Sequence, residues 1–207
     1  MFHYLLTQYP TYINYSIIYF KTLILIKNEN NIKLYIKIRR IKMKNNYQED
    51  IRIENNNYNF HIRVVAVIRE NNKYLIQQID GYKYYVLPGG HTHLGESSIQ
   101  AIKREIKEEL ECDIKETKLF CIHENFYPKN NKIEHWIEFY FKVKLKDKLN
   151  NKDWDITEND NGKIITSHFI WVTNEELKEL DLKPSTIKEL LINNKIDEFN
   201  YLIDEIK

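Results

Sequence analysis

Cysteine is scarce in this chain of 207 residues, which contains only two. Cys112 and Cys121 stand nine positions apart, without a second pair of cysteines or a histidine at the spacing of zinc ligands. Disulfide-stabilised secreted domains and structural zinc modules both need more cysteines than this. The sequence therefore argues against both classes and favours a reducing, cytoplasmic location.

Long hydrophobic runs are also absent. The most apolar early segment, residues 15–26, contains Lys21, and its length falls short of the roughly 20 apolar residues that a membrane-spanning helix needs. A secretory signal carries its positive charges before the apolar run, but here the cations follow it. We expect no membrane span and no export, although a basic amphipathic segment could lie on an anionic membrane surface.

Neither sign of charge dominates, because 31 Lys and Arg stand against 30 Asp and Glu, a net charge of +1. This balance argues against a surface that binds nucleic acids. Residues 1–42 nevertheless have a net charge of +6, so the remaining 165 residues have a net charge of −5. The composition also shifts at Met43. We interpret residues 1–42 as a basic leader, either disordered or an artefact of the gene model, and residues 43–207 as the folded domain.

Hydrophobic residues make up 43% of the chain and aromatic residues 13%, which is enough for the core of one domain. Residues 61–69 form a β-branched run typical of a strand buried on both faces, and Asn71-Asn72 marks a hairpin turn after it. The pattern predicts strands at 61–69, 73–79, 84–87, 118–127, 133–146 and 164–172, helices at 97–111, 174–180, 184–193 and 196–206, and a surface loop at 150–162. This order indicates a mixed α/β domain in which helices cover one sheet.

The segment 133–146 alternates most regularly. Its odd-numbered positions from Ile133 to Leu145 point to one face, and its even-numbered positions from Glu134 to Lys144 point to the other. We expect the first face to lie in the core and the second, which carries Trp136 and Tyr140, to be polar.

The helix expected from Ser97 to Glu111 carries two functional stripes. Ser97 and Gln100 form a capping box at its start. An apolar stripe should pack the helix on the sheet; it consists of Ile99, Ile102, Ile106 and Leu110. A second stripe consists of Glu105, Glu108 and Glu109, whose Cβ atoms would lie about 5 to 6 Å apart.

Three neighbouring carboxylates repel one another. An exposed pair costs a few tenths of a kcal/mol, whereas at an effective dielectric constant of about 20 two charges 4 Å apart repel by roughly 4 kcal/mol. Partial burial of the stripe would therefore favour either protonation or a bound cation. Carboxylate oxygens suit Mg²⁺ or Mn²⁺. By themselves, however, the three glutamates are more typical of an acidic, solvated helix face.

The residues upstream of the glutamates favour the metal site. Gly90 is followed after five residues by Glu96, and after seven more by the run Arg104-Glu105-Ile106-Lys107-Glu108-Glu109. This resembles the signature of the Nudix hydrolase family, G-x5-E-x7-R-E-U-x-E-E-x-G-U with U aliphatic, at all six required Gly, Arg and Glu positions through Glu109. At the end of the motif, Glu111 replaces the second glycine and Cys112 the last aliphatic residue. The resemblance implies an α/β/α sandwich with a central mixed sheet, from about residue 55 to 206.

The resemblance also implies site residues. Glu108, Glu109 and the carbonyl oxygen of Gly89 would be metal ligands, and Glu105 a ligand or the base that orients water. Gly90 would let substrate and metal approach the backbone. Arg104 and Glu96 would pair and hold the loop against the helix.

The implied reaction is hydrolysis of the pyrophosphate in a nucleoside diphosphate derivative, with Mg²⁺ or Mn²⁺ as cofactor. Pro128, 16 positions after Cys112, is similar to a proline of ADP-ribose-cleaving members, which favours that substrate class. Nucleoside triphosphates, dinucleoside polyphosphates and a non-catalytic nucleotide-sensing module are alternatives. The partner is then a small nucleotide rather than a nucleic acid, and a homodimer is compatible with the sequence.

Residues outside the signature are open. Trp136 or Tyr140 could stack on a base, although aromatic residues on sheets more often pack in the core. Glu138 or Glu158 could supply a further carboxylate, although both could equally be surface residues. The loop histidines His91 and His93 could touch phosphate, but we expect them to be solvated.

Overall fold

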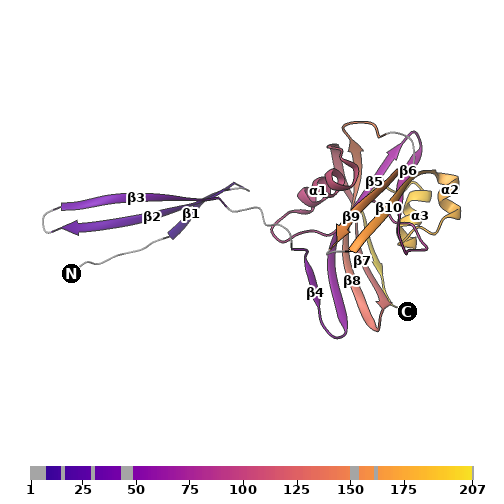
Figure 1. Ribbon diagram of the computed structural model, residues 1–207, viewed down its shortest axis with the longest axis horizontal. Coiled ribbons are helices and arrows are strands. Elements are labelled where there is room, and N and C mark those ends of the chain that lie inside the picture. Colours follow the sequence, from indigo (N-terminus) through magenta and orange to yellow (C-terminus); the bar gives the residue numbers. More distant parts are fainter. Residues whose placement is uncertain are drawn as a thin grey trace. The chain divides into compact units, whose positions relative to one another are not determined.

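A computed structural model describes residues 8–14, 17–28, 31–42, 49–149, 154–160 and 163–206. The chain divides into two compact units, Met1–Tyr47 and Gln48–Lys207 (Figure 1). The first unit contains the antiparallel strands β1 (Gln8–Asn14), β2 (Ile17–Asn28) and β3 (Asn31–Lys42) in that spatial order. The interpretation of residues 1–42 as a leader stays a prediction.

In the described part of the second unit, eight strands form one mixed sheet. Their order is β11-β7-β8-β5-β6-β10-β9, and β4 pairs with β5 outside this path. β5 pairs with β8, and β11 with β7, in parallel, whereas the other pairs are antiparallel. The strands are β4 (Arg52–Glu54), β5 (Tyr58–Glu70), β6 (Lys73–Ile79), β7 (Ile114–Lys129), β8 (Lys132–Leu145), β9 (Trp154–Asp160), β10 (Lys163–Thr173) and β11 (Asn200–Asp204).

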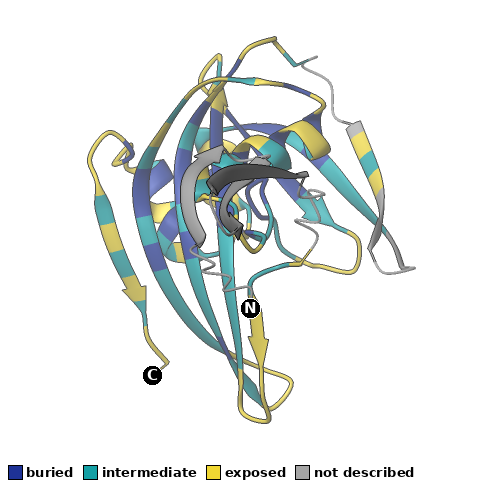
Figure 2. Cartoon of the chain, turned by 90° about the vertical axis from the view of Figure 1, so that its left-hand side faces the viewer, coloured by how far each residue is buried: buried dark blue, intermediate teal, exposed yellow. Residues whose placement is uncertain are grey.

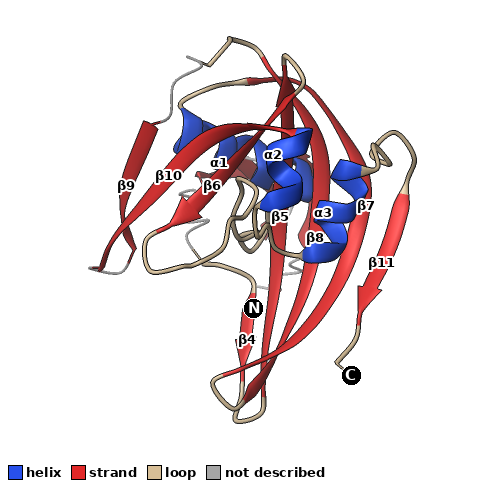
Figure 3. Ribbon diagram, turned by 90° about the vertical axis from the view of Figure 1, so that its right-hand side faces the viewer, coloured by secondary structure: helices blue, strands red, loops and turns tan. Residues whose placement is uncertain are grey.

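Helices cover both faces of this sheet, with α1 (Ser98–Leu110) on one side and α2 (Asn174–Glu179) and α3 (Ser185–Ile192) on the other (Figure 3). Successive residues of β5 serve the two layers, since Val64 packs in the α1 core and Val65 in the α2–α3 core. The buried residues gather in these layers, whereas the tip of the β7–β8 hairpin is exposed (Figure 2). The predicted α/β/α sandwich with a central mixed sheet is confirmed.

Two Asn-Asn turns join long strands of the sheet. Asn71 and Asn72 connect β5 to β6, and Asn130 and Asn131 connect β7 to β8. All four have φ between +49° and +61°, the left-handed conformation that two-residue hairpin turns need and that asparagine adopts more readily than most residues. The hairpin turn predicted at Asn71-Asn72 is therefore confirmed, and a turn of the same kind joins β7 to β8.

Three predicted elements are wrong. Residues 196–206 do not form a helix but contain strand β11, which pairs with β7. Leu202 is partly buried while Tyr201 and Ile203 are exposed, which is the alternation of period two that a strand shows. The expected loop 150–162 contains the edge strand β9, although residues 150–153 and 161–162 lie outside the described residues. Residues 84–87 form only isolated bridges, at Tyr85 and Val86.

The expectation that the even-numbered face of β8 is a solvated polar face is also wrong. Glu134, Glu138 and Tyr140 are each no more than 5% exposed, because a second layer of chain covers this face as well. No helix in the described part of the chain is long and apolar enough to cross a membrane.

Candidate active site

Helix α1 starts and packs as its sequence predicts. Ser97 Oγ accepts a hydrogen bond from the backbone N–H of Gln100 at 3.3 Å, and Gln100 Oε1 accepts one from the backbone N–H of Ser97 at 2.8 Å. Ile102 and Ile106 are fully buried against β5 and its neighbours. Ile99 is an exception, since it is 49% exposed. The packed stripe turns the acidic side of α1 toward the loop that follows β6.

That loop contains Gly89 and Gly90, and each glycine is required for a different reason. A Cβ on Gly90 would lie 2.4 Å from Glu105 Oε2, so the missing side chain lets this carboxylate reach the loop. Gly89 has φ of +133°, and a Cβ there would lie 2.2 Å from the backbone oxygen of Val64 in β5. The two glycines thus bring loop, sheet and acidic helix together.

Arg104 collects the carboxylates of the signature around one guanidinium group. Its Nη2 lies 2.7 Å from Glu96 Oε1, and its Nη1 lies 2.8 Å from Glu105 Oε1 and 2.9 Å from Glu108 Oε2. Nη2 also donates to the carbonyl oxygen of His91 at 2.8 Å. The predicted pair of Arg104 and Glu96 is present, and it fixes the loop to the helix.

Glu109 faces the same loop from one turn further along α1. Its Oε2 accepts a hydrogen bond from the backbone N–H of Gly89 at 2.9 Å, and its Oε1 lies 3.4 Å from Gln77 Nε2. The carbonyl oxygen of Gly89, a predicted metal ligand, accepts a hydrogen bond from Arg63 Nη2 at 2.9 Å. Gly89, Gly90, Glu105 and Glu109 therefore meet at one place.

The carboxylates differ in their protonation behaviour. Burial raises the pKa of Glu105 to about 7, against the opposing effect of Arg104, and the nearby Glu108 raises it further. Burial also acts on Glu96, but there the hydrogen bonds from Arg104 prevail and hold the pKa below its ordinary value. Glu96 is thus an ionised structural partner at neutral pH, whereas Glu105 can take up or release a proton.

The donor set suits a divalent cation in chemistry and in charge. Glu96, Glu105, Glu108 and Glu109 contribute four carboxylates, and Arg63 and Arg104 contribute two guanidinium groups, which leaves two negative charges when all six groups are ionised. Carboxylate and backbone carbonyl oxygens are the ligands of hard cations. Within the described ranges, no three His, Cys, Asp or Glu side chains are already arranged around one point as metal ligands. Glu105 and Glu108 are instead turned toward Arg104.

Helix α1 ends at the position where the signature has its second glycine. Glu111 occupies this position with φ of +55° and ψ of +15°, and its backbone N–H donates to the carbonyl oxygen of Lys107 at 3.1 Å. The left-handed turn that glycine usually makes is therefore kept, although a residue with a Cβ adopts it at some cost. The glutamates up to Glu109 all lie within the helix, before this turn.

An aromatic cluster borders the loop. Trp136 stacks on His61 with ring centroids 4.3 Å apart and planes at 20°, and its Nε1 donates to Glu134 at 3.0 Å. His91 packs beside both rings, and its Nε2 lies 3.2 Å from His61 Nδ1. Of the predicted substrate-binding residues, the structure thus places Trp136 next to the loop that carries Gly90.

Tyr140 and Glu138 lie elsewhere. Tyr140 is 1% exposed in the α2–α3 core, and its hydroxyl donates to Glu138 Oε2 at 3.0 Å. Glu138 is buried as well and lies 3.2 Å from His123 Nδ1. Neither side chain presents a surface to a nucleobase. The side chain of Glu158 lies outside the described residues.

Sequence reasoning missed two residues of the site. Arg63 holds the Gly89 carbonyl, and His61 supports Trp136. His91, a candidate from the sequence, contacts His61 through its ring and Arg104 through its carbonyl oxygen. We expected His91 and His93 to be solvated, but this is wrong, since their side chains are only 21% and 16% exposed. His61 and Arg63 occupy alternate positions of β5 on the face that continues with the buried Val65 and Val67, and these two polar residues directly before an apolar pair are the available signal.

The comparisons with known proteins agree with this geometry. The family model described as the NUDIX domain matches residues 59–191. A MutT protein from Bacillus halodurans has a similar structure, with 22% identity, a TM-score of 0.51, and coverage of 68% of this chain and 86% of that one. A Nudix hydrolase from Nitrosomonas europaea matches with 20% identity, a TM-score of 0.45, and coverage of 67% and 91%.

An ADP-ribose pyrophosphatase from Streptococcus suis matches with 15% identity, a TM-score of 0.39, and coverage of 70% and 98%. Among curated proteins, none matches the sequence significantly. The matched range contains the glycine loop, Arg104 and all the glutamates of the signature. The chain therefore belongs to the Nudix family of pyrophosphohydrolases.

Proposed function

We propose that this protein hydrolyses the pyrophosphate bond of a nucleoside diphosphate derivative, with ADP-ribose-like compounds as the favoured substrates and Mg²⁺ or Mn²⁺ as the cofactor. The observation that carries the proposal is that Glu105 and Glu109 meet the Gly89–Gly90 loop while Arg104 pairs with both Glu105 and Glu108, with more carboxylates than guanidinium groups at the site. Such an excess of negative charge has a use where a divalent cation and a phosphate bind together.

Each residue has a definite task in this proposal. Glu108, Glu109 and the carbonyl oxygen of Gly89 hold the cation, and Glu105 is either a further ligand or the base that takes the proton of the attacking water. The bound cation would neutralise phosphate oxygens and make the phosphorus easier to attack. Arg104 and Glu96 keep the loop and helix at a constant distance.

The substrate assignment depends on features around the loop. Trp136, stacked on His61 beside His91, offers an aromatic surface next to the site. The two cysteines are free and buried, which suits the reducing cytoplasm where we place the activity.

The test is a panel of ADP-ribose, nucleoside triphosphates and dinucleoside polyphosphates, each incubated with Mg²⁺ or Mn²⁺ and resolved by chromatography. We expect AMP from ADP-ribose, and a rate on the order of 10²-fold lower for Glu109→Gln. Glutamine keeps an oxygen that can accept from the Gly89 N–H but lacks the charge. Glu111→Gln removes the same charge two residues further on and should leave the rate unchanged.

Two results would contradict the proposal. Equal rates for wild type and Glu109→Gln would refute the assignment of the metal ligands. Binding of ADP-ribose without any cleavage, under every metal condition, would instead indicate a nucleotide-sensing module.

A further inference from the structure

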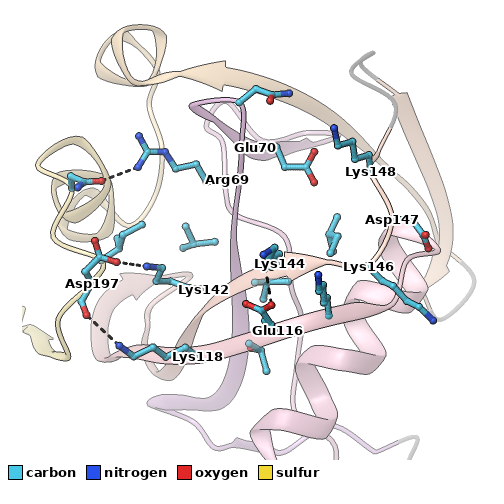
Figure 4. A pocket seen from close by; sticks show the side chains of 18 residues that line it. Arg69, Glu70, Glu116, Lys118, Lys142, Lys144, Lys146, Asp147, Lys148 and Asp197 are labelled. Carbon is cyan, nitrogen blue, oxygen red and sulfur yellow. Dashed lines mark hydrogen bonds and ion pairs between the residues drawn. The ribbon is translucent and has the colours of Figure 1, made fainter.

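A basic groove lies where β5 and β8 end, away from the glycine loop. Its volume is about 920 Å³, and it is lined by the end of β5, the start of β7, the end of β8 and residues 194–197 (Figure 4). None of the described residues that line it belongs to the candidate active site. A volume of this order accommodates a small-molecule ligand.

The charge of the groove is opposite to that of the unit that contains it. Of the 31 cationic and 30 acidic residues in the chain, eight and one respectively lie in residues 1–47, so residues 48–207 have 23 against 29, a net charge of −6. Seven Lys or Arg residues and four Asp or Glu residues line the groove, a net charge of +3. A concave basic surface on an acidic unit concentrates anions locally.

The cations are held together by the pairing of β7 with β8. Lys118 lies directly opposite Lys142 in this register, an arrangement of like charges that is unfavourable by itself. Asp197 compensates both, because its carboxylate pairs with Lys142 and its carbonyl oxygen accepts from Lys118 Nζ at 3.4 Å. The molecule thus already places an anionic group between two lysines at one end of the groove.

Further cations extend from this pair along the groove. Lys144 lies two residues after Lys142 on the same face of β8, and its ion pair with Glu116 is long, at 3.7 Å. Arg69 and Lys148 border the hollow on other sides (Figure 4). Lys148 has neither an ion pair nor a hydrogen bond to the rest of the described chain. These positive charges remain available to a ligand.

The lining also indicates the kind of anion. No aromatic residue is among the described side chains that line the groove, so a base would find no ring to stack on. Lysine binds phosphate as a point charge without demanding a particular orientation. We propose that this groove binds a small oligophosphate, a chain of two or more phosphoryl groups, either inorganic or carried by a nucleotide.

The test is calorimetric titration of the full-length protein with inorganic tripolyphosphate in EDTA, which removes divalent metal from the active site. The double variant Lys142→Gln/Lys144→Gln should bind about tenfold more weakly, because two charge-assisted contacts are lost. The control is Lys178→Gln/Lys183→Gln, which removes two lysines that are also ion-paired, with Glu175 and Asp181. This control should bind within about twofold of wild type, because screening limits the influence of distant charges.

A second pair of variants tests the opposite direction. Asp197→Asn removes the carboxylate that pairs with Lys142 and should tighten binding severalfold. Asp181→Asn removes a carboxylate of similar exposure, 59% against 70%, that is paired with Lys183, and should change binding little. A gain for Asp197→Asn supports the groove even if the double lysine variant does not fold.

The source of the phosphate chain follows from a parallel titration with ATP. Equal affinities would indicate that the phosphate chain alone is recognised, and tighter ATP binding that is lost in Lys142→Gln/Lys144→Gln would indicate a nucleotide. The proposal is overturned if tripolyphosphate does not bind, if the control lysine variant weakens binding equally, or if Asp197→Asn leaves the affinity unchanged.

Discussion

Replacing Gly90 by alanine should separate catalysis from folding. The new Cβ would lie 2.4 Å from Glu105 Oε2, whereas ordinary contacts begin at about 3.4 Å, so the carboxylate must move by about 1 Å. Gly90 does not have the positive φ that disfavours alanine, and the atoms it would meet belong to the end of a flexible side chain. We therefore expect a loss of only about 1 kcal/mol in the free energy of unfolding, the cost of an unfavourable rotamer.

The catalytic effect of the same change should be much larger. A displacement of about 1 Å in a reacting group can lower a rate by roughly 10²-fold, equivalent to about 2.7 kcal/mol in the barrier. The measurements are kcat/KM on the best substrate of the panel and urea denaturation of the same sample.

Gly89→Ala serves as the comparison. Its Cβ would lie 2.2 Å from the backbone oxygen of Val64, at φ of +133°, and a strand backbone cannot move aside as a side chain can. We expect a loss of more than about 3 kcal/mol from strain and overpacking. Wild-type activity in Gly90→Ala, or equal destabilisation by both substitutions, would refute this account of the loop.

The remaining predictions concern the end of α1, His91 and the metal. Glu111→Gly should raise the free energy of unfolding by about 1 kcal/mol, because glycine adopts the left-handed conformation without strain, whereas Glu111→Ala should bring no gain; urea denaturation measures both. Burial, reinforced by Arg52, lowers the pKa of His91 to about 2, so below pH 6.5 the unfolded chain takes up a proton that the folded protein does not. From pH 6.5 to 5 the uptake of this one proton by the unfolded chain should lower the free energy of unfolding by about 1.7 kcal/mol. In His91→Gln the free energy of unfolding should fall by about 1.7 kcal/mol less than in wild type over this range, and identical pH profiles for the two proteins would contradict the assignment. EDTA should abolish hydrolysis without lowering the melting temperature by more than a few degrees, since buried apolar residues and not metal hold α1 on the sheet; unfolding in EDTA would show that the metal is structural.

Much of the site could be predicted because its spacing is set by a single helix. Glu105, Glu108 and Glu109 lie within two turns of α1, and the capping box at Ser97 marks where that helix begins. Once the helix is correct, the relative positions of the glutamates follow from 3.6 residues per turn. The residues that support this part, such as Arg63 on β5, come from sequence-distant strands whose register no local pattern reveals.

The elements that were mispredicted are those whose neighbours decide their conformation. Residues 196–206 contain enough apolar residues for a helix, but β11 forms there because the edge of β7 offers backbone partners from Cys121 to Asn125. Strand β9, which is polar enough to resemble a loop, likewise lies at an edge of the sheet and pairs with β10. Intrinsic propensity is a weak guide at such edges because the pairing partner contributes the stabilising hydrogen bonds.

The two faces of β8 show the same dependence on context in a way that bears on function. The strand does alternate as its sequence predicts, but an amphipathic strand has a solvated face only when nothing covers that face. Here the even-numbered face contains Glu138 and Tyr140, which are buried and hydrogen-bonded to each other, whereas Trp136 lies further along the same face beside the glycine loop. A side chain from this face can therefore reach a substrate only near the loop end of the strand, which is why, of the two aromatic candidates, the proposed function retains Trp136 and not Tyr140.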